Sequence, residues 1–143
     1  MKKLNKPVQG SLLISEPFLL DSYFKRAVVL LSEHDEKGTL GFILNKPTDV
    51  NLNDAVDDFP EFKAPLYFGG PVETDTLFYI HTVGHLLEGS KEILNGIFWG
   101  GDYDQLKFLI DTKQIQPDQI RFYAGYSGWE PKQLDHEMKE KSW

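Results

Sequence analysis

The sequence contains no cysteine among its 143 residues. This absence excludes disulfide bridges, a catalytic thiol and the cysteine-rich zinc sites, and it leaves four histidines as the only soft metal ligands. We therefore expect no metal and no other cofactor. Long apolar runs are missing too, because no stretch approaches the roughly 18 consecutive apolar residues that a transmembrane helix requires. The sequence predicts no membrane association.

Positive charge is scarce as well. Lys and Arg number 15 against 22 Asp and Glu, which gives a formal net charge of −7. Nucleic-acid binding depends on Lys and Arg neutralising phosphates, so an acidic domain needs a segregated basic face to achieve it. Lys25 and Arg26 form one basic pair, and the lysines near the C-terminus alternate with glutamates. We expect no direct binding to nucleic acid.

The N-terminus lacks the apolar segment of a secretory signal. Residues 1–10 carry Lys2, Lys3 and Lys6, but no apolar run precedes Pro7. We expect no signal peptide, and the predicted location is cytoplasmic.

The length and the even composition of the chain indicate one domain. Domains cluster near about 100–150 residues, and no internal repeat, low-complexity tract or linker interrupts the 143 residues. Apolar residues make up 41% of the chain, which is ample for an ordinary core. We predict a single domain over residues 1–143.

A β-hairpin is predicted in the first third of the chain. Residues 27–31 and 40–44 are continuous apolar runs rich in strand-forming residues, and a short polar loop with Gly38 joins them. Neither run alternates between apolar and polar, so both faces are expected to be covered. The hairpin should therefore lie centrally in its sheet.

Three helices accompany the predicted strands. The first covers residues 51–59 with Asn51 as its cap, the second begins at Asp102 with a capping-box Gln105, and the third has Pro131 as its first residue. Strands outnumber helices and do not alternate regularly with them, which favours an α+β fold over a doubly wound α/β sheet. The further predicted strands are 11–14, 66–68, 77–81, 91–94, 97–99 and 120–126.

Gly125-Tyr126-Ser127-Gly128-Trp129 is the nearest approach to a catalytic motif. A nucleophile elbow needs glycine two residues before and two residues after its serine, because the sharp turn crowds both positions. The second place is held by Trp129, so the spacing fails. We interpret the segment as a tight strand-to-helix turn anchored by Trp129, and we predict no catalytic residue.

The histidines offer weak patterns. His81 and His85 stand four residues apart, but Gly84 interrupts them and no glutamate follows His81 as zincin chemistry requires. A strand-end histidine and a loop histidine are the favoured interpretation, so no metal-binding residue is predicted. Glu33-His34-Asp35 is an acid–base cluster at the expected hairpin tip, where exposed loops commonly collect such residues without function.

Two glycine pairs could suggest phosphate binding. Gly100-Gly101 precedes a helix, but the carboxylate of Asp102 would occupy the same N–H groups. Gly69-Gly70-Pro71 could form a backbone nest, although Pro71 removes one donor and no lysine follows. Phosphate binding is disfavoured at both. Asn45, beside Lys46 and Pro47, is typical of local turn hydrogen bonding, and presentation of its amide to a ligand remains open.

The order of these segments closely resembles the bacterial YqgE/AlgH family over residues 10–143. The elements GGPV and GYxGW-x-x-x-QL are the most specific. The matching motifs are Gly10-Ser11-Leu12-Leu13, Phe24-Lys25-Arg26-Ala27-Val28, Glu33-His34, Gly41-Phe42-Ile43-Leu44-Asn45-Lys46-Pro47, Phe68-Gly69-Gly70-Pro71-Val72, Gly101-Asp102, Gly125-Tyr126-Ser127-Gly128-Trp129 and Gln133-Leu134 with Glu137.

The resemblance implies a mixed, bifurcated β-sheet, part of it curled into a small barrel, with flanking helices. It implies a bacterial cytosolic protein without an established enzymatic activity. The AlgH name carries a description as a transcriptional regulator, which rests on association with alginate production and not on a DNA-binding element. The chain departs from the pattern at Ser127, where members usually carry alanine. The family pattern also continues beyond Trp143, so we expect a further strand and helix of the family to be absent.

Function is not established by these patterns, and three hypotheses follow from them. The leading one is a non-catalytic cytosolic module that binds a small molecule or a partner protein. The alternative is a transcriptional regulator that acts through a partner, and a hydrolase is the third.

A shared site would lie where three strand-ending segments meet in one cleft. Amides of Asn45 and Gln133 would face a ligand, with walls from Tyr126 and Trp129. The competing interpretation is three independent structural turns. The candidate ligand-binding residues are Asn45, Gly69, Gly70, Pro71, Tyr126, Trp129 and Gln133.

Overall fold

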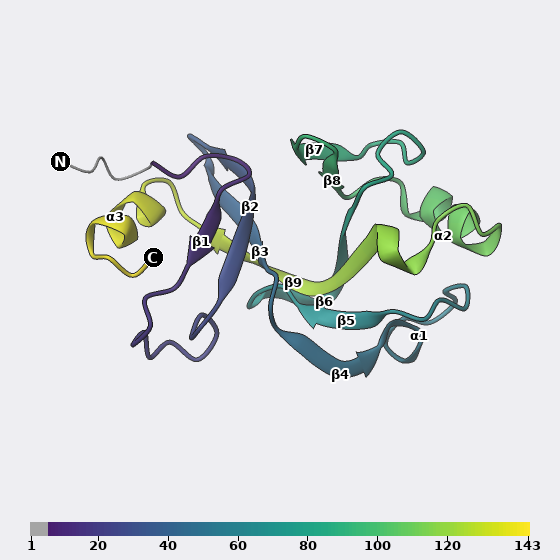
Figure 1. The fold of residues 1–143 in the computed structure, drawn as a ribbon, viewed down its shortest axis with the longest axis horizontal. Coiled ribbons are helices and arrows are strands. Elements are labelled where there is room, and N and C mark those ends of the chain that lie inside the picture. The colour runs from purple at the N-terminus through teal and green to yellow at the C-terminus, as the bar shows by residue number, and fades with distance from the viewer. Residues whose placement is uncertain (1–5) are drawn as a thin grey trace.

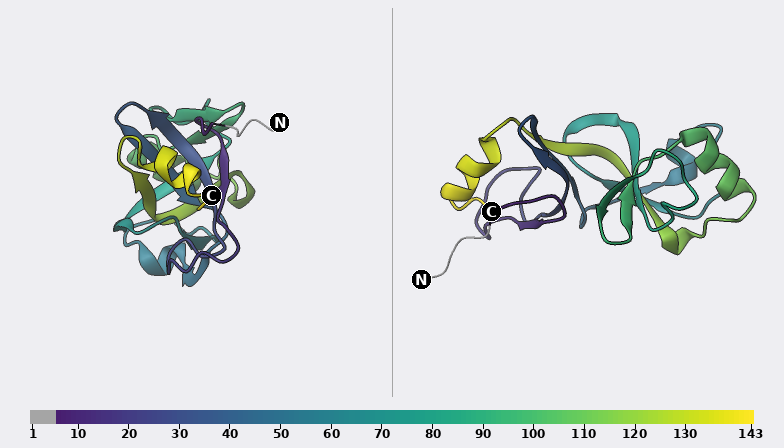
Figure 2. Two further views of the ribbon diagram at one scale, coloured as in Figure 1. Left: turned by 90° about the vertical axis from the view of Figure 1, so that its left-hand side faces the viewer. Right: turned by 90° about the horizontal axis from the view of Figure 1, so that it is seen from above.

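One long strand, β9 (Ile120–Trp129), links two lobes of the molecule in the computed structural model, which describes residues 6–143 (Figure 1). The signal-peptide prediction rests partly on residues 1–5, which lie outside the described residues. Within residues 6–143, no helix combines the length and the apolar character needed to cross a membrane. The lobes lie side by side along the long axis when the molecule is seen from above (Figure 2).

The first lobe contains the predicted hairpin. Its strands form an antiparallel sheet in the order β1-β2-β3-β9, so the hairpin strands are central, as predicted. A helix packs beside this sheet (Figure 1). The elements are β1 (Leu12–Ile14), β2 (Val28–Asp35), β3 (Gly38–Ile43), the second half of β9 and α3 (Gln133–Lys139).

The second lobe surrounds the first half of β9. The strand β6 pairs with it in antiparallel orientation, and β5 pairs with it in parallel orientation. The elements are β4 (Pro47–Asn51), α1 (Leu52–Ala55), β5 (Pro65–Phe68), β6 (Val72–His81), β7 (Lys91–Leu94), β8 (Ile97–Trp99), α2 (Tyr103–Asp111) and a 3-10 turn (Pro117–Gln119).

The division of β9 between two sets of partners makes the sheet bifurcated and mixed. The strand pairs with β6 between Ile120 and Tyr126 and with β5 over Phe122–Ala124, and it then pairs with β3 at Ser127–Trp129. Among the described residues, three helices flank the curled sheet. The predicted α+β class, the bifurcated mixed sheet and its barrel-like part are confirmed.

Each lobe has its own hydrophobic core. Leu106, Phe122 and their neighbours fill the larger core, and Leu31, Ile43 and Leu134 lie in the smaller one. Between the lobes, the ring of Phe42 lies 5.4 Å from that of Tyr123 and 5.9 Å from that of Trp99. This aromatic contact ties the two cores together at the place where β9 crosses.

The predicted first helix is shorter than expected. It covers Leu52–Ala55, and Asn51 precedes it in extended conformation without a side-chain cap. The side chain of Asn53 accounts for the loop that replaces the rest of the predicted helix. Its Nδ2 donates to the Pro60 carbonyl at 2.9 Å, and its Oδ1 accepts the Phe62 N–H at 2.8 Å. An asparagine that bonds the backbone locally competes with the helix.

The predicted turn at residues 125–129 is wrong, because β9 continues through Trp129. Gly125 adopts a φ of +74° and bends the strand without ending it. The next residues then pair with β3, and Ser127 is completely buried. The strand β4 was not predicted either. The α3 helix begins at Gln133, two residues after Pro131.

Candidate functional site

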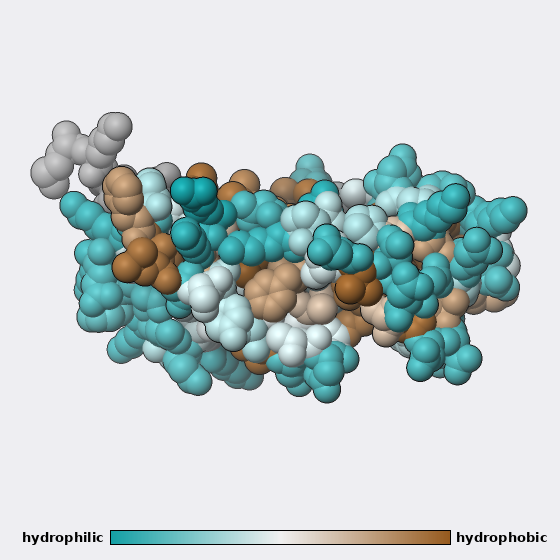
Figure 3. All heavy atoms as spheres, turned by 90° about the horizontal axis from the view of Figure 1, so that it is seen from below, coloured by the Kyte–Doolittle hydropathy of each residue, from teal (hydrophilic) through white to brown (hydrophobic). Residues whose placement is uncertain are grey.

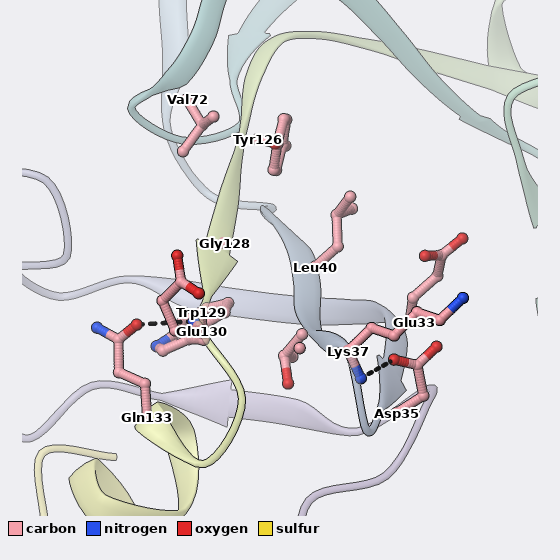
Figure 4. Close-up of a pocket in the computed structure, with 12 residues that line it drawn as sticks. Glu33, Asp35, Lys37, Leu40, Val72, Tyr126, Gly128, Trp129, Glu130 and Gln133 are labelled. Carbon is pink, nitrogen blue, oxygen red and sulfur yellow. Dashed lines mark hydrogen bonds between the residues drawn. The ribbon is translucent and has the colours of Figure 1, made fainter.

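A groove of about 470 Å³ lies where the β2–β3 hairpin meets the end of β9 and the start of α3 (Figure 4). Its walls come from three parts of the chain that are distant in sequence: residues 33–40, Val72 and residues 126–133. The lining residues are Glu33, Asp35, Lys37, Gly38, Thr39, Leu40, Val72, Tyr126, Gly128, Trp129, Glu130 and Gln133.

Two aromatic and two aliphatic side chains form the apolar part of the groove. Tyr126 is half-buried, and its ring packs edge-on against Phe78 with centroids 5.5 Å apart. Trp129 is 5% exposed at the end of β9. In Figure 4, Val72 and Tyr126 lie at one end of the groove, with Leu40 between them and the polar residues. An apolar wall of this kind suits the carbon skeleton of a ligand.

The polar part of the groove is mainly acidic. Glu33, Asp35 and Glu130 contribute carboxylates, and Lys37 contributes the one cationic side chain among the lining residues. Lys91, from β7, forms an ion pair with Glu33 at 3.3 Å. A groove with more carboxylates than cations attracts a positively charged group.

Gln133 and the adjacent Glu137 organise this end of the molecule. The Gln133 side chain accepts the Glu130 N–H at 2.9 Å and donates to Glu137 at 3.1 Å. The other oxygen of Glu137 accepts the indole N–H groups of Trp129, at 3.1 Å, and Trp143, at 2.9 Å. The Gln133 amide is thus committed to fixing the loop, and the Trp129 indole is held in one orientation.

Of the seven candidate residues from the sequence, the structure brings three together. Tyr126, Trp129 and Gln133 line the groove, whereas the other four candidates lie outside its lining. Gly69 and Gly70 are buried behind β9, where a Cβ on Gly70 would lie 2.2 Å from the Tyr126 carbonyl carbon. Pro71 follows them and precedes Val72, which does reach the groove.

Asn45 binds backbone groups. Its Oδ1 accepts the Val28 N–H at 2.9 Å, and its Nδ2 donates to the Arg26 carbonyl at 2.9 Å. Arg26 adopts a φ of +52°, a left-handed conformation that costs a non-glycine residue roughly 1 kcal/mol. The Asn45 amide spans this strained residue and fixes the entry into β2.

The serine of the 125–129 segment does not act as a nucleophile in this arrangement. Ser127 is 0% exposed, and its Oγ donates to the Gly69 carbonyl at 3.1 Å. No substrate can reach the oxygen, and the hydrogen bond crosses between β9 and the Gly69–Gly70 segment. The side chain therefore helps to hold the junction of the two lobes.

The pair formed by His81 and Ser90 does not form a catalytic dyad either. Ser90 Oγ lies 3.3 Å from His81 Nε2, but that nitrogen also lies 2.8 Å from the Gly100 carbonyl and must donate to it. His81 Nδ1 accepts the Val83 N–H at 3.2 Å. Both nitrogens are engaged, so His81 cannot take a proton from Ser90. Burial lowers the pKa of His81, against the smaller opposing effect of the bond to Gly100.

The described residues do not include a cluster of side chains that could bind a metal ion. Within residues 6–143, no three His, Asp or Glu side chains gather as ligands for an ion. His34, in the acid–base cluster recognised from sequence, pairs through Nδ1 with Thr39 Oγ1 at 2.6 Å. That contact spans the hairpin.

Sequence reasoning missed the acidic part of the groove. Glu33 and Asp35 were noticed as a cluster, but they were not connected with Trp129 and Gln133. Thr39 pairs with Trp129 across β3 and β9, and this pairing brings the hairpin to the end of β9. The sequence analysis interprets residues 125–129 as a turn, whereas the strand continues through them to Trp129.

The comparisons with known proteins agree with the fold. Residues 12–143 match a family model, DUF179, described as AlgH-like. A "UPF0301 protein" of Chlorobium limicola is 46% identical over 143 residues, which is 100% of this chain and 76% of that protein. One of Parabacteroides distasonis is 45% identical over 139 residues, covering 96% of this chain and 70% of that protein.

Two solved structures have the same fold. The solution structure of the AlgH protein from Pseudomonas aeruginosa has a TM-score of 0.77 at 30% identity, covering 100% of this chain and 79% of that one. The crystal structure of protein DIP2367 from Corynebacterium diphtheriae has a TM-score of 0.79 at 24% identity, covering 99% and 76%. None of these names states a reaction or a ligand.

Proposed function

The chain belongs to the AlgH-like DUF179 family, and on that premise we propose that it is a non-catalytic module that binds a small molecule through the groove between the β2–β3 hairpin and α3. The observation that carries the proposal is the groove itself, which joins an apolar wall to an acidic rim. The proposed location is cytoplasmic.

The side chains that line the groove indicate the chemical class of the ligand. The half-buried Tyr126 suits an apolar or planar skeleton, and its ring can also hold a cation over its face. Glu130 and the hairpin carboxylates suit an amine or guanidinium group. The proposed ligand therefore carries a positive charge on an apolar skeleton.

The surroundings of the two candidate nucleophiles, Ser127 and Ser90, favour binding over hydrolysis. Ser127 is sealed between the lobes, and the nitrogen of His81 nearest to Ser90 donates to a backbone carbonyl.

Native mass spectrometry against matched sets of amine-bearing, neutral and carboxylate compounds tests this function. We expect capture from the amine set. Glu130→Gln should weaken that binding by about three- to fivefold, the value of one partly exposed ion pair. The control is Asp57→Asn, which removes the same charge from an exposed position remote from the groove lining. Preference for carboxylates, or equal effects of the two variants, would contradict the proposal.

A further inference from the structure

Gly128 is the one glycine of the chain whose missing side chain the fold does not explain. The twelve glycines all lie within residues 6–143. Eleven of them either have a left-handed φ or lie so close to other atoms that a Cβ would come within 3.0 Å of one. Gly128 has no left-handed φ, and the nearest atom to its Cβ position is Cε2 of Tyr126, at 3.3 Å. Neither backbone conformation nor close packing therefore requires a glycine here.

The absence of a side chain at Gly128 leaves the floor of the groove open. Gly128 lies in the part of β9 that pairs with β3, opposite Leu40. Glycine weakens the interior of a strand, and it often marks a place where another group approaches the backbone closely. Gly128 is exposed and lines the groove, so the group that approaches it would belong to a bound molecule.

Side chains surround this opening on three sides. In Figure 4, Tyr126 lies above Gly128, Leu40 to its right and Glu130 below it, and all of them line the groove. Residues two apart along a strand are about 7 Å apart, so the gap between Tyr126 and Glu130 suits one ring. Trp129 points to the opposite face of the sheet, where its ring packs 5.9 Å from that of Trp143. The opening thus has an aromatic ring at one end and a carboxylate at the other.

Apolar atoms elsewhere on the surface do not form a comparable site. Seen from below, brown apolar atoms appear in several separate places among teal hydrophilic residues (Figure 3). Separate apolar residues of this kind are ordinary on a protein surface. The opening at Gly128 differs because a hollow, an aromatic wall and a carboxylate coincide there.

We propose that the ligand carries a flat aromatic ring that lies on Gly128 beside Tyr126, and a cation on a short arm that reaches Glu130. This assignment rests on the proposed function and specifies its ligand class as an arylalkylamine. A flat ring can contact the bare backbone over its whole face, whereas a puckered ring of the same size is thicker and makes fewer contacts. The Tyr126 ring favours a second aromatic ring as its neighbour.

Isothermal titration calorimetry with phenethylamine and cyclohexylethylamine tests the shape of the site. The two compounds share the ammonium group and the arm, and they differ in whether the ring is flat. Burial of apolar area alone would favour the cyclohexyl compound, which has the larger apolar surface. We expect the wild-type chain to bind phenethylamine about fivefold more tightly, the value of one aromatic contact.

The role of Gly128 is tested by adding side chains to it. Gly128→Val fills the opening and should weaken phenethylamine binding by at least about tenfold, as overpacking of a fitted site does. Gly128→Ala should weaken it by about threefold. Thr76→Val is the matched control, because it places valine at an exposed position of β6 outside the groove lining and should bind as the wild type does. Valine favours strand conformation, and circular dichroism checks that each variant folds.

The outcomes separate this assignment from the proposed function. If the wild-type chain binds no amine of any kind, the proposed function fails and the assignment fails with it. If amines bind but the cyclohexyl compound is preferred, only the assignment of a flat ring is overturned. Phenethylamine binding that is unchanged in the folded Gly128 variants overturns it as well.

Discussion

His81 shows how a single residue couples burial to protonation. It is 2% exposed, and both of its ring nitrogens bond backbone groups: Nε2 donates to the carbonyl of Gly100, in the Gly100–Gly101 turn, and Nδ1 accepts the Val83 N–H. Tyr79 supports the same turn by donating to the Gly101 carbonyl at 2.6 Å, and burial raises the pKa of Tyr79 to about 12. The turn is thus held by two neutral side chains.

Acid should therefore destabilise the protein partly through His81. Burial lowers the pKa of His81 below its usual value of about 6.5, so the unfolded chain binds the proton more readily. The stabilisation from neutral His81 is complete above about pH 6.5 and is lost as the pH falls through the folded pKa. Urea unfolding at pH 7.5 and 5.5 measures the change in free energy.

The matched variants are His81→Gln and His85→Gln. His81→Gln should lower the free energy of unfolding by about 1–3 kcal/mol at pH 7.5, because the buried Val83 N–H loses its acceptor. On acidification, this variant should then lose less stability than the wild type. His85 is exposed, so its variant should keep the wild-type pH dependence. Equal pH dependence in all three proteins would contradict this role.

At the scale of elements, β9 depends on close backbone contact at its middle. Gly70 and Gly125 face each other there, and a Cβ on Gly125 would lie 2.4 Å from the Gly70 carbonyl oxygen. The contact lets one strand serve two lobes. The Gly69-Gly70-Pro71 motif and the Gly125 motif, prominent in the sequence, meet at this crossing.

Gly70→Ala should lower the free energy of unfolding by more than about 3 kcal/mol, because the added Cβ would meet backbone atoms that cannot move aside. Gly96→Ala is the control. Gly96 has a φ of +83°, but nothing lies within 4 Å of its Cβ position, so it should cost about 1–2 kcal/mol from backbone strain alone. Urea denaturation compares the two, and equal costs would show that the crossing tolerates displacement.

Some elements could be predicted from local pattern alone. The hairpin around Gly38 and the cap of α2, where Asp102 accepts the Gln105 N–H at 2.9 Å, depend on residues close together in the sequence. The end of β9 could not be predicted, because its strand conformation depends on pairing with the distant β3, in which Thr39 lies opposite Trp129. The same pairing decides which residues line the groove.

At the scale of the whole molecule, some of the described cations are engaged in holding the fold. Lys25, Arg26, Lys46 and Arg121 lie near the junction of the lobes, but two of them serve the fold. Lys46 Nζ donates to the Lys25 carbonyl at 2.8 Å. Arg121 donates to the Leu44 carbonyl at 3.2 Å and lies over the ring of Tyr67.

With a net charge of −7 and two of these four cations engaged in the fold, we expect no detectable binding to duplex DNA at physiological salt. A mobility-shift assay with random duplex at micromolar protein is the measurement. Retardation that weakens as salt is added would contradict the prediction, because salt dependence identifies phosphate contacts.

The sequence by itself determined the fold class and the family, because strand-forming runs, glycine turns and helix caps act over a few residues. It also placed Tyr126, Trp129 and Gln133 at one end of the chain's last strand. Only the tertiary structure decided that Asn45 serves the backbone, that Ser127 is buried and that Glu33 and Glu130 share a groove. The physical reason is that these outcomes depend on strand pairing across the sheet, and the free energy of that pairing comes from contacts between residues distant in sequence.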